Sequence, residues 1–398
     1  MIKKIKNLLA GIIIGIVFSV AMYNVPKAIS SDWTTALPFT PQQLSIIKQV
    51  KLALSTYQVD GDKKDKIVDD KMYYGAMTGL VNSVGDPFTR YVSPETLKEE
   101  QTEMEGEYGG LGIYITTREG KTTVITPIEN TPADKVGIKP LDEIVRIGDK
   151  NAYGMTSEEV VKLLRGEAGS AVKILVKRKK ADKLIPFTIV REVIKIKSVR
   201  LEMINDIAYI KINQFMLKTD SELKEIMKIA ENKKAKGILL DLRNNPGGLL
   251  DVCVNVTSQF INKGVVVGMK GRFEKANETL YVNEGHATKL PIVVLVNEGS
   301  ASAAEILAGA IKDHKRGTIV GMKTFGKGSV QSLFNLPDGS GVYITIARYT
   351  TPSGYVIDHK GLEPHVKMSG EVKKNKKEDV QLQKGLSVLK NKIASQGN

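Results

Sequence analysis

Residues 291–310 of this 398-residue chain read PIVVLVNEGSASAAEILAGA. The apolar run at 292–296 is typical of a strand in a sheet that is covered on both faces. The chain then breaks at small and polar residues and continues as a predicted helix over 302–312. A strand that runs directly into a helix is the repeating unit of an α/β core.

The neighbouring segments continue this alternation from about residue 194. Strand patterns lie at 207–212, 237–242 and 265–269, and helix patterns lie at 221–231 and 249–260. Asp338-Gly339 predicts a hairpin turn before a strand at 342–349. A last helix is expected near 380–393, in a Lys-rich end. The fold class predicted for this part is therefore α/β.

The chain before residue 194 has a different pattern. Short β-rich segments lie between about 103 and 193, and Thr156 and Glu159 have the spacing of a capping box. The expected strands are 112–116, 122–127, 143–147, 171–177 and 185–191. Thr40-Pro41 begins a predicted helix, and a second apolar helix ends before Gly85-Asp86-Pro87. Such helices usually pack on a neighbour, so we expect a homodimer.

Composition limits the possible classes. Hydrophobic residues are 42% and charged residues 26% of the chain, a balance that excludes disordered, collagen-like and multi-pass membrane proteins. The net charge of +14 raises nucleic acid or an anionic membrane as partners. The single cysteine, Cys253, excludes an intramolecular disulfide and a Cys-rich metal site.

The N-terminus has the pattern of an export signal. An uncharged apolar run from Leu8 to Tyr23 follows Lys3, Lys4 and Lys6. As a helix this run is about 24 Å long, shorter than the ~30 Å hydrocarbon core. A cleaved signal peptide and a retained membrane anchor both remain open, with the anchor favoured, and a buried core helix is the third alternative.

Three glycine-containing or serine-containing segments are candidates for chemistry. The loop Gly109–Ile113 either is an ordinary turn or presents free amides to a carboxylate. In DLRNNPGGLL (241–250), two glycines at a strand-to-helix junction suit an oxyanion or a phosphate, but the Lys-Ser/Thr pair of a P-loop is absent. Ser302 is either a helix N-cap or a nucleophile at the positive end of a helix.

A nucleophilic serine needs a base. None of the four histidines, His286, His314, His359 and His365, lies in the context of a catalytic triad, and His359 and His365 lack a third metal ligand. Lys327 lies between two glycines. It is either a loop charge or, if desolvated enough to be neutral, a general base.

The segments taken together resemble known families. Residues 110–113, 131–138 and 141–148 resemble a PDZ domain with its carboxylate-binding loop. NNPGG (244–248), NEGSASAAEILAGA (297–310) and KTFGKGSVQ (323–331) resemble the carboxyl-terminal processing peptidases. This resemblance covers the chain from about Leu44 to Val366.

The resemblance implies a role for particular residues. Ser302 would be the nucleophile, Lys327 the general base and Gln331 the residue that positions the lysine. The backbone amides of Gly248 and Ala303 would form the oxyanion hole. The PDZ loop, comprising Gly110, Leu111, Gly112 and Ile113, would receive the substrate, and Arg165 would couple the PDZ domain to the active site. The mechanism needs no metal and no cofactor.

The resemblance also implies a fold and a domain order. The fold would be a crotonase-like or ClpP-like β/α spiral core with an inserted PDZ domain and an N-terminal helical region. The expected parts are a signal peptide or anchor (1–30), a helical dimerisation region (31–100), a PDZ domain (101–193), a serine peptidase core (194–368) and a basic C-terminal helix or tail (369–398).

The implied function is a serine endopeptidase that cleaves proteins near their C-termini, with a PDZ domain that binds the substrate carboxylate and gates the active site. The expected partners are proteins with free C-termini, the membrane through the N-terminal segment and a second copy of the chain, without nucleic acid. The expected place is the extracytoplasmic face of the bacterial cell membrane, anchored or secreted. A membrane-tethered, non-catalytic PDZ adaptor and an acyl-CoA enzyme on the same core are the alternatives.

Overall fold

The structure is a computed structural model that describes residues 39–57, 66–179, 181, 183–283, 285, 287–373 and 375–396. The chain divides into two compact units, residues 1–77 and 78–398. The predicted anchor at Leu8–Tyr23 lies outside the described residues. Among the helices that are described, none has the length and apolarity needed to cross a bilayer.

Helix α2 (Pro41–Tyr57) belongs to the first unit and begins where the sequence predicts. Thr40 N donates to Gln43 Oε1 over 2.8 Å, and Gln43 N donates back to Thr40 Oγ1 over 3.2 Å. None of its side chains is buried. Helix α3 (Lys66–Asn82) follows and ends before the predicted turn at Gly85.

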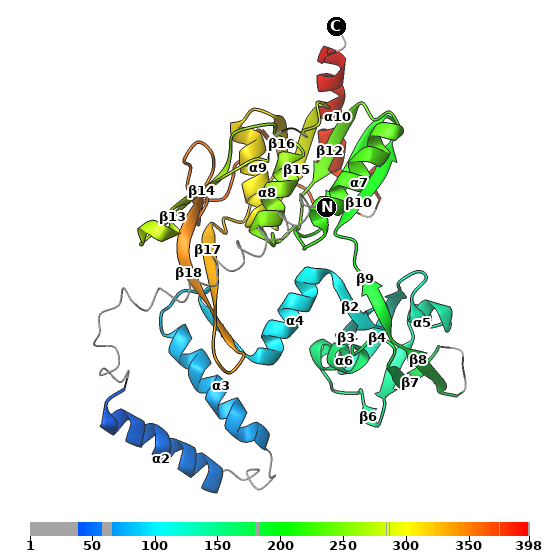
Figure 1. Cartoon of the computed structure of the whole chain (residues 1–398). Helices are drawn as coiled ribbons and strands as arrows, with labels where there is room; N and C mark the ends of the chain where they lie inside the picture. Colours follow the sequence, from blue (N-terminus) through cyan, green and yellow to red (C-terminus); the bar gives the residue numbers. More distant parts are fainter. Residues whose placement is uncertain are drawn as a thin grey trace, which may run out of the picture. The chain divides into compact units, whose positions relative to one another are not determined.

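A six-stranded sheet forms the centre of the α/β core (Figure 1). Its strand order is β10-β11-β12-β15-β16-β19, with β10 antiparallel to β11 and every other pair parallel. The strands are β10 (Val199–Ile204), β11 (Ile207–Ile212), β12 (Gly237–Asp241), β15 (Ile292–Val296), β16 (Gly317–Gly321) and β19 (Val366–Lys367).

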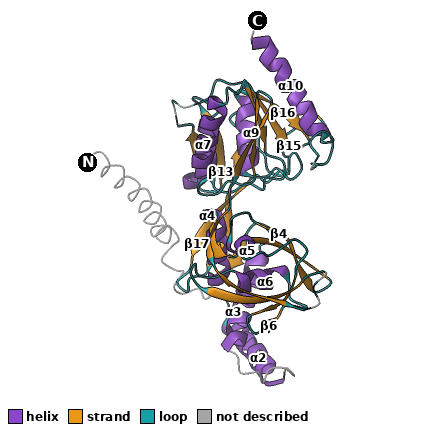
Figure 2. Cartoon of the chain, turned by 90° about the vertical axis from the view of Figure 1, so that its right-hand side faces the viewer, coloured by secondary structure: helices purple, strands orange, loops and turns teal. Residues whose placement is uncertain are grey.

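Helices cover both faces of this sheet, as the continuous apolar strands require (Figure 2). Side chains of β12 alternate between two hydrophobic clusters: Ile238 and Leu240 face one, and Leu239 faces the other. The first cluster contains α7 (Thr219–Asn232), α8 (Leu250–Ser258) and α9 (Ala303–Asp313), and the second contains α10 (Val380–Gln396).

A second, antiparallel sheet contains the predicted hairpin. Strand β17 (Ser329–Asn335) pairs with β18 (Gly341–Thr350), and the turn between them contains Asp338 and Gly339, as expected. The predicted strand at 265–269 belongs to this sheet, where it pairs with β18, and not to the central one. The remaining elements are β1 (Arg90–Val92), β13 (Val265–Gly271), the 3₁₀ helix η2 (Glu274–Ala276) and β14 (Glu278–Tyr281).

The β-rich segment folds around its own hydrophobic cluster, which extends from Leu111 to Ile189. Its sheet has the order β3-β4-β5-β7-β8, with β6 on β5, and β2 pairs separately with β9. Thr156 and Glu159 form the predicted capping box of α6. The elements are α4 (Pro94–Glu105), β2 (Glu107–Gly110), β3 (Ile113–Arg118), β4 (Lys121–Pro127), α5 (Pro132–Lys135), β5 (Glu143–Ile147), β6 (Lys150–Asn151), α6 (Ser157–Leu164), β7 (Ala171–Lys177), β8 (Ile185–Val190) and β9 (Glu192–Lys195).

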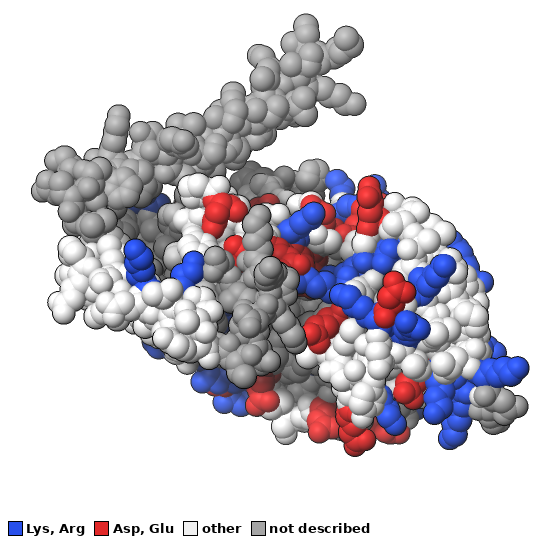
Figure 3. All heavy atoms as spheres, turned by 90° about the horizontal axis from the view of Figure 1, so that it is seen from below, with Lys and Arg blue, Asp and Glu red and all other residues white. Residues whose placement is uncertain are grey.

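Charges are distributed over the described surface. On the face that Figure 3 shows, Lys and Arg side chains are interspersed with Asp and Glu. Ion pairs on the described surface include Lys135 with Glu192 and Lys162 with Glu95. The face in Figure 3 is therefore mixed in sign despite the net charge of +14.

A buried ion-pair network attaches the C-terminal helix to the core. The guanidinium of Arg243 is 1% exposed and contacts Asp241 and Asp379, each over 2.8 Å. Gln381 Oε1 accepts a further hydrogen bond from Arg243 over 3.2 Å. Since Arg243 immediately precedes the NNPGG segment, the start of α10 is fixed beside this loop.

Asp379→Ala leaves the buried Arg243 guanidinium without one of its two carboxylate partners. We expect the free energy of unfolding to fall by about 3–5 kcal/mol, because the remaining charge stays buried and incompletely paired. Urea denaturation followed by circular dichroism measures the change. Glu371→Ala removes an exposed partner of Lys373 and serves as the control, with an unchanged midpoint. Equal midpoints for both variants would contradict the importance of the network.

Candidate active site

Ser302 lies at the sharp turn from β15 into α9. Its backbone has φ 53° and ψ −117°, a conformation that residues other than glycine rarely adopt. Such strain concentrates at functional sites, and a serine on a strained strand-to-helix turn is the geometry of a nucleophile elbow. Glu305 N donates to the Ser302 carbonyl oxygen over 2.8 Å, and Ser302 N donates to Glu305 Oε2 over 2.9 Å, so Glu305 holds the backbone of this turn.

The two glycines of NNPGG pack against neighbouring backbone. Gly248 has φ 138°, and a Cβ there would lie 2.1 Å from Phe215 O. Gly247 has φ 103°, and a Cβ there would lie 2.7 Å from Ser302 Cβ. A side chain at either position would collide with these atoms. Because both residues are glycines, the NNPGG loop can approach Ser302 closely.

The predicted oxyanion-hole residues lie on these same two segments. Ala301 N donates to Asn245 O over 2.9 Å and thereby joins the NNPGG loop to the turn at Ser302. Among the backbone hydrogen bonds of the described residues, none uses the N–H of Gly248 or Ala303 as its donor. Free amides beside a helix N-terminus can stabilise a developing negative charge.

Glu305 is a site residue that the sequence analysis missed. It is fully buried, and its Oε2 accepts hydrogen bonds from Ser302 N and Lys327 N, each over 2.9 Å. Its Oε1 accepts from Gly326 N over 2.8 Å and from Thr324 Oγ1 over 2.5 Å. Burial raises the pKa of Glu305, although these four donors act in the opposite direction.

Glu305 brings together the backbones of the two predicted catalytic residues, because both backbone nitrogens bind one carboxylate oxygen. The signal for this residue was visible in the sequence. Ser302 and Glu305 have the Ser-x-x-Glu spacing of a capping box, whose glutamate reaches back to the N-cap amide.

Lys327 lies on the loop between β16 and β17 and is half-buried. Burial lowers the pKa of its ammonium, and the nearby charge of Arg90 lowers it further. Both effects favour the neutral amine that a general base requires. Lys327 Nζ lies 5.0 Å from the centroid of the Phe88 ring, and no hydrogen bond joins it to Ser302 Oγ among the described residues.

Gln331 has a different partner from the one expected. Its Nε2 donates to Ser329 Oγ over 2.7 Å, and both residues lie on β17. Alternate residues of a strand point to the same face, which accounts for this contact. In this structure Gln331 therefore does not bind Lys327, and its positioning role stays a prediction.

The described histidines are engaged elsewhere. His314 Nε2 lies 2.7 Å from Val265 O, and Ile319 N donates to His365 Nδ1 over 3.0 Å. The side chain of His359 is largely exposed, beside Asp358. His286 lies outside the described residues.

The predicted carboxylate-binding loop connects β2 to β3. Leu111 is 2% exposed, and its carbonyl accepts a hydrogen bond from Ala133 N over 2.9 Å. Gly112 has φ 74°, and its carbonyl accepts from Ile128 N over 2.8 Å. Among the strands that the structure describes, β3 pairs only with β4, so one edge of β3 could accept an added strand.

Arg165 lies at the end of α6, where the β-rich segment meets α4. Its guanidinium stacks over the Tyr108 ring at 4.4 Å and lies 3.9 Å from Glu103 Oε1. Arg165 and Tyr108 line a cavity of about 240 Å³ together with Gln214 and Met216 of the core.

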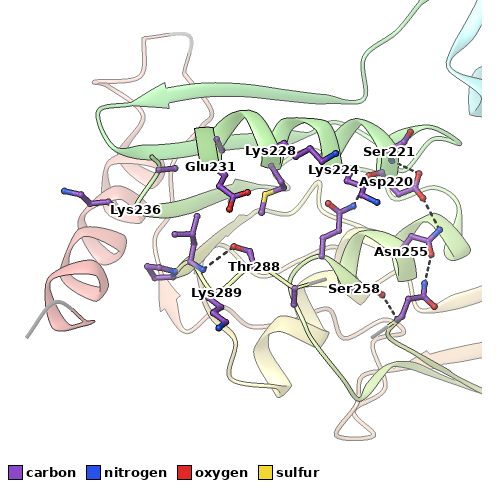
Figure 4. Close-up of a pocket in the computed structure, with 18 of the residues that line it drawn as sticks. Asp220, Ser221, Lys224, Lys228, Glu231, Lys236, Asn255, Ser258, Thr288 and Lys289 are labelled. Atoms are coloured by element: carbon purple, nitrogen blue, oxygen red, sulfur yellow. Dashed lines mark hydrogen bonds between the residues drawn. The ribbon is translucent and has the colours of Figure 1, made fainter. Parts of the chain in front are cut away.

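A larger open cavity of about 1240 Å³ lies elsewhere on the core, between α7 and α8 (Figure 4). Its rim combines basic and acidic side chains, among them Lys224, Lys228 and Glu231 on α7 and Lys289 opposite them. None of the predicted site residues lines it.

Comparisons with known proteins identify the families to which this chain is similar. The family described as "Peptidase family S41" matches residues 206–368, and the family described as "PDZ domain" matches residues 109–188. The carboxy-terminal-processing protease of Bartonella bacilliformis is 41% identical over 305 residues, which cover 75% of this chain and 70% of that protein. The carboxy-terminal processing protease CtpA of Bacillus subtilis is 36% identical over 318 residues, 80% of this chain and 68% of that protein.

A solved structure named photosystem II D1 C-terminal processing protease aligns with 84% of this chain and 95% of its own chain. The identity is 30% and the TM-score is 0.49.

Gly247→Ala introduces a methyl group where Ser302 Cβ already lies. We expect Ser302 to be displaced and the cleavage rate of an unfolded reporter protein to fall at least about a hundredfold, as when an oxyanion donor is lost. Gly79→Ala is the control, because a Cβ at Gly79 meets nothing within 4 Å. If both variants cleave at the wild-type rate, the close approach at Gly247 has no catalytic importance.

Proposed function

Because the chain belongs to peptidase family S41, as a carboxy-terminal processing serine protease with a PDZ domain, we propose that Ser302 and Lys327 form its catalytic pair. The main support for this assignment is that the Glu305 carboxylate accepts hydrogen bonds from the backbone N–H groups of both residues. The strained turn at Ser302 and the burial of Lys327 support it.

The proposed reaction is acyl transfer. Neutral Lys327 takes the proton of Ser302 as Oγ bonds to the scissile carbonyl, and the N–H groups of Gly248 and Ala303 stabilise the oxyanion. The lysine ammonium then gives that proton to the leaving amine. A water molecule, deprotonated by the same lysine, then bonds to the acyl carbon. The bond from this carbon to Ser302 Oγ breaks, and Oγ takes back the proton from the lysine.

We extend the proposal to substrate delivery. The loop Gly110–Ile113 binds the C-terminal carboxylate of the substrate, and the free edge of β3 pairs with the residues before it. Arg165 couples this binding to the active site through the cavity that it shares with Met216. Met216 follows Phe215, whose backbone binds both Gly247 O and Leu249 N in the NNPGG segment.

We propose that the core has a crotonase-like or ClpP-like arrangement. Parallel strands β11, β12, β15 and β16 alternating with helices, with a second sheet beside them, support a crotonase-like or ClpP-like spiral core. The domain boundaries at 100/101, 193/194 and 368/369 remain predictions.

We place the protein at the extracytoplasmic face of a bacterial membrane. The support is the Lys-flanked apolar run Leu8–Tyr23, with the positive residues on the cytoplasmic side. Protease protection of spheroplasts, in which the chain should be degraded by added protease, tests this placement.

Ser302→Ala and Lys327→Ala should each reduce cleavage of an unfolded reporter at least about a thousandfold while the melting temperature stays near that of the wild type. Cleavage by the wild type should rise with pH as Lys327 loses its proton. Since burial lowers the pKa of Lys327, this rise should be complete below the ordinary titration range of lysine. Normal turnover by either variant, or a rate independent of pH, would refute the pair.

We propose that α2 mediates a homodimer, because its apolar side chains are exposed, among them Ile47 and Val50. The double variant Ile47→Asp, Val50→Asp should sediment as a monomer, since burying two carboxylates in an apolar interface is unfavourable. Gln42→Asp, on the same helix, should leave the oligomeric state unchanged. Sedimentation velocity of the protein without residues 1–30 makes the comparison, and a wild-type monomer would contradict the proposal.

A further inference from the structure

Phe88 belongs to a short, well-anchored turn between α3 and β1. The Asp86 carboxylate accepts hydrogen bonds from Phe88 N over 3.1 Å and from Thr89 Oγ1 over 2.6 Å. Thr89 Oγ1 in turn accepts from Thr345 N of β18 over 3.1 Å. These contacts fix the backbone of Phe88 to the antiparallel sheet, so its ring has a defined position beside the Lys327 loop.

The Phe88 ring lies beside the Lys327 ammonium. Lys327 Nζ lies 5.0 Å from the ring centroid, within the range of a cation–π contact. Lys327 has no ion pair among the described residues, and Phe88 is half-buried.

The charged groups on the surrounding elements do not replace the ring. Arg90 of β1 is ion-paired with Glu100 over 2.7 Å, and its charge disfavours a second cation. Glu305 of α9 binds the backbone of Lys327. On the 351–365 segment, Asp358 is paired with Arg348 over 2.7 Å, and His359 lies beside Asp358.

We propose that Phe88 is a positioning residue for the catalytic base: its ring holds the Lys327 ammonium in a resting position away from Ser302. The inference rests on the proposed role of Lys327. Productive catalysis then requires Lys327 to leave the ring and reach Ser302 Oγ, and the ring contact opposes that movement as long as the amine carries its proton.

The same ring lines a second cavity. Phe88 contributes to the wall of a cavity of about 780 Å³, together with apolar side chains from the end of α3, from the turn after it and from β18, namely Leu80, Val84 and Ile344. A group that enters this cavity therefore contacts the ring that holds the base.

Phe88→Leu removes the ring but keeps an apolar side chain, and Phe88→Tyr keeps the ring. In a Ser302→Ala background, the pKa of Lys327 follows directly from the pH dependence of its acylation by acetic anhydride, read by mass spectrometry. We expect the leucine variant to lower this pKa by about one unit and the tyrosine variant to restore it, because a cation–π contact stabilises the charged form by about that amount.

In the active enzyme, Phe88→Leu should move the acid limb of the kcat/KM profile down by about one pH unit. The rate at neutral pH should then rise up to about tenfold. Phe273→Leu removes a phenylalanine that is exposed on the surface elsewhere. It should change neither the Lys327 pKa nor the kcat/KM profile. Melting temperatures confirm that each variant is folded.

The outcomes separate the inference from the proposed function. An unchanged Lys327 pKa in Phe88→Leu overturns the inference, as does an equal loss of rate in the leucine and tyrosine variants, which would show a merely structural role. Full activity of Lys327→Ala overturns the proposed catalytic pair instead, and the acylation readout still reports whether the ring stabilises the ammonium.

Discussion

The buried carboxylate of Glu305 is the constraint on which the proposed catalytic centre depends. The turn at Ser302 and the loop 324–327, which are separate in sequence, both donate hydrogen bonds to the Glu305 carboxylate. These four donors compensate for the removal of the carboxylate from water. Toward Ser302 and Lys327, the carboxylate accepts hydrogen bonds from the backbone N–H groups. The backbone of the proposed site is thus held in place by one buried group.

The groups around Lys327 favour its neutral form over its protonated form. A carboxylate beside the ammonium would stabilise the protonated form and weaken the base at neutral pH. Lys327 is instead half-buried, near Arg90 and beside the Phe88 ring. Burial and Arg90 both disfavour the protonated ammonium, and the ring stabilises it modestly. The pKa of Lys327 is therefore lowered, which makes loss of the ammonium proton easier.

The sequence was informative where the pattern is local. The apolar run of β15 and the following α9 are found within one residue of prediction, and the turn at Asp338-Gly339 forms the expected hairpin. Strands β16 and β19 were not predicted, because β19 has only two residues and both are defined mainly by pairing across the sheet. Glu305 was visible only as a helix cap. The contact between Phe88 and Lys327 depends on tertiary packing between segments far apart in the chain, which no local pattern encodes.

The ion pair that attaches α10 to the core can form only late in synthesis, because one of its residues lies near the C-terminus. Residues 206–368 match the peptidase family, yet Asp379, which closes the buried pair with Arg243, lies beyond them. Synthesis proceeds from the N-terminus, so the NNPGG segment is made long before Asp379. Until the final segment folds back, Arg243 lacks this counter-charge, and the nascent chain contains every proposed catalytic residue before the loop that serves them is fully secured.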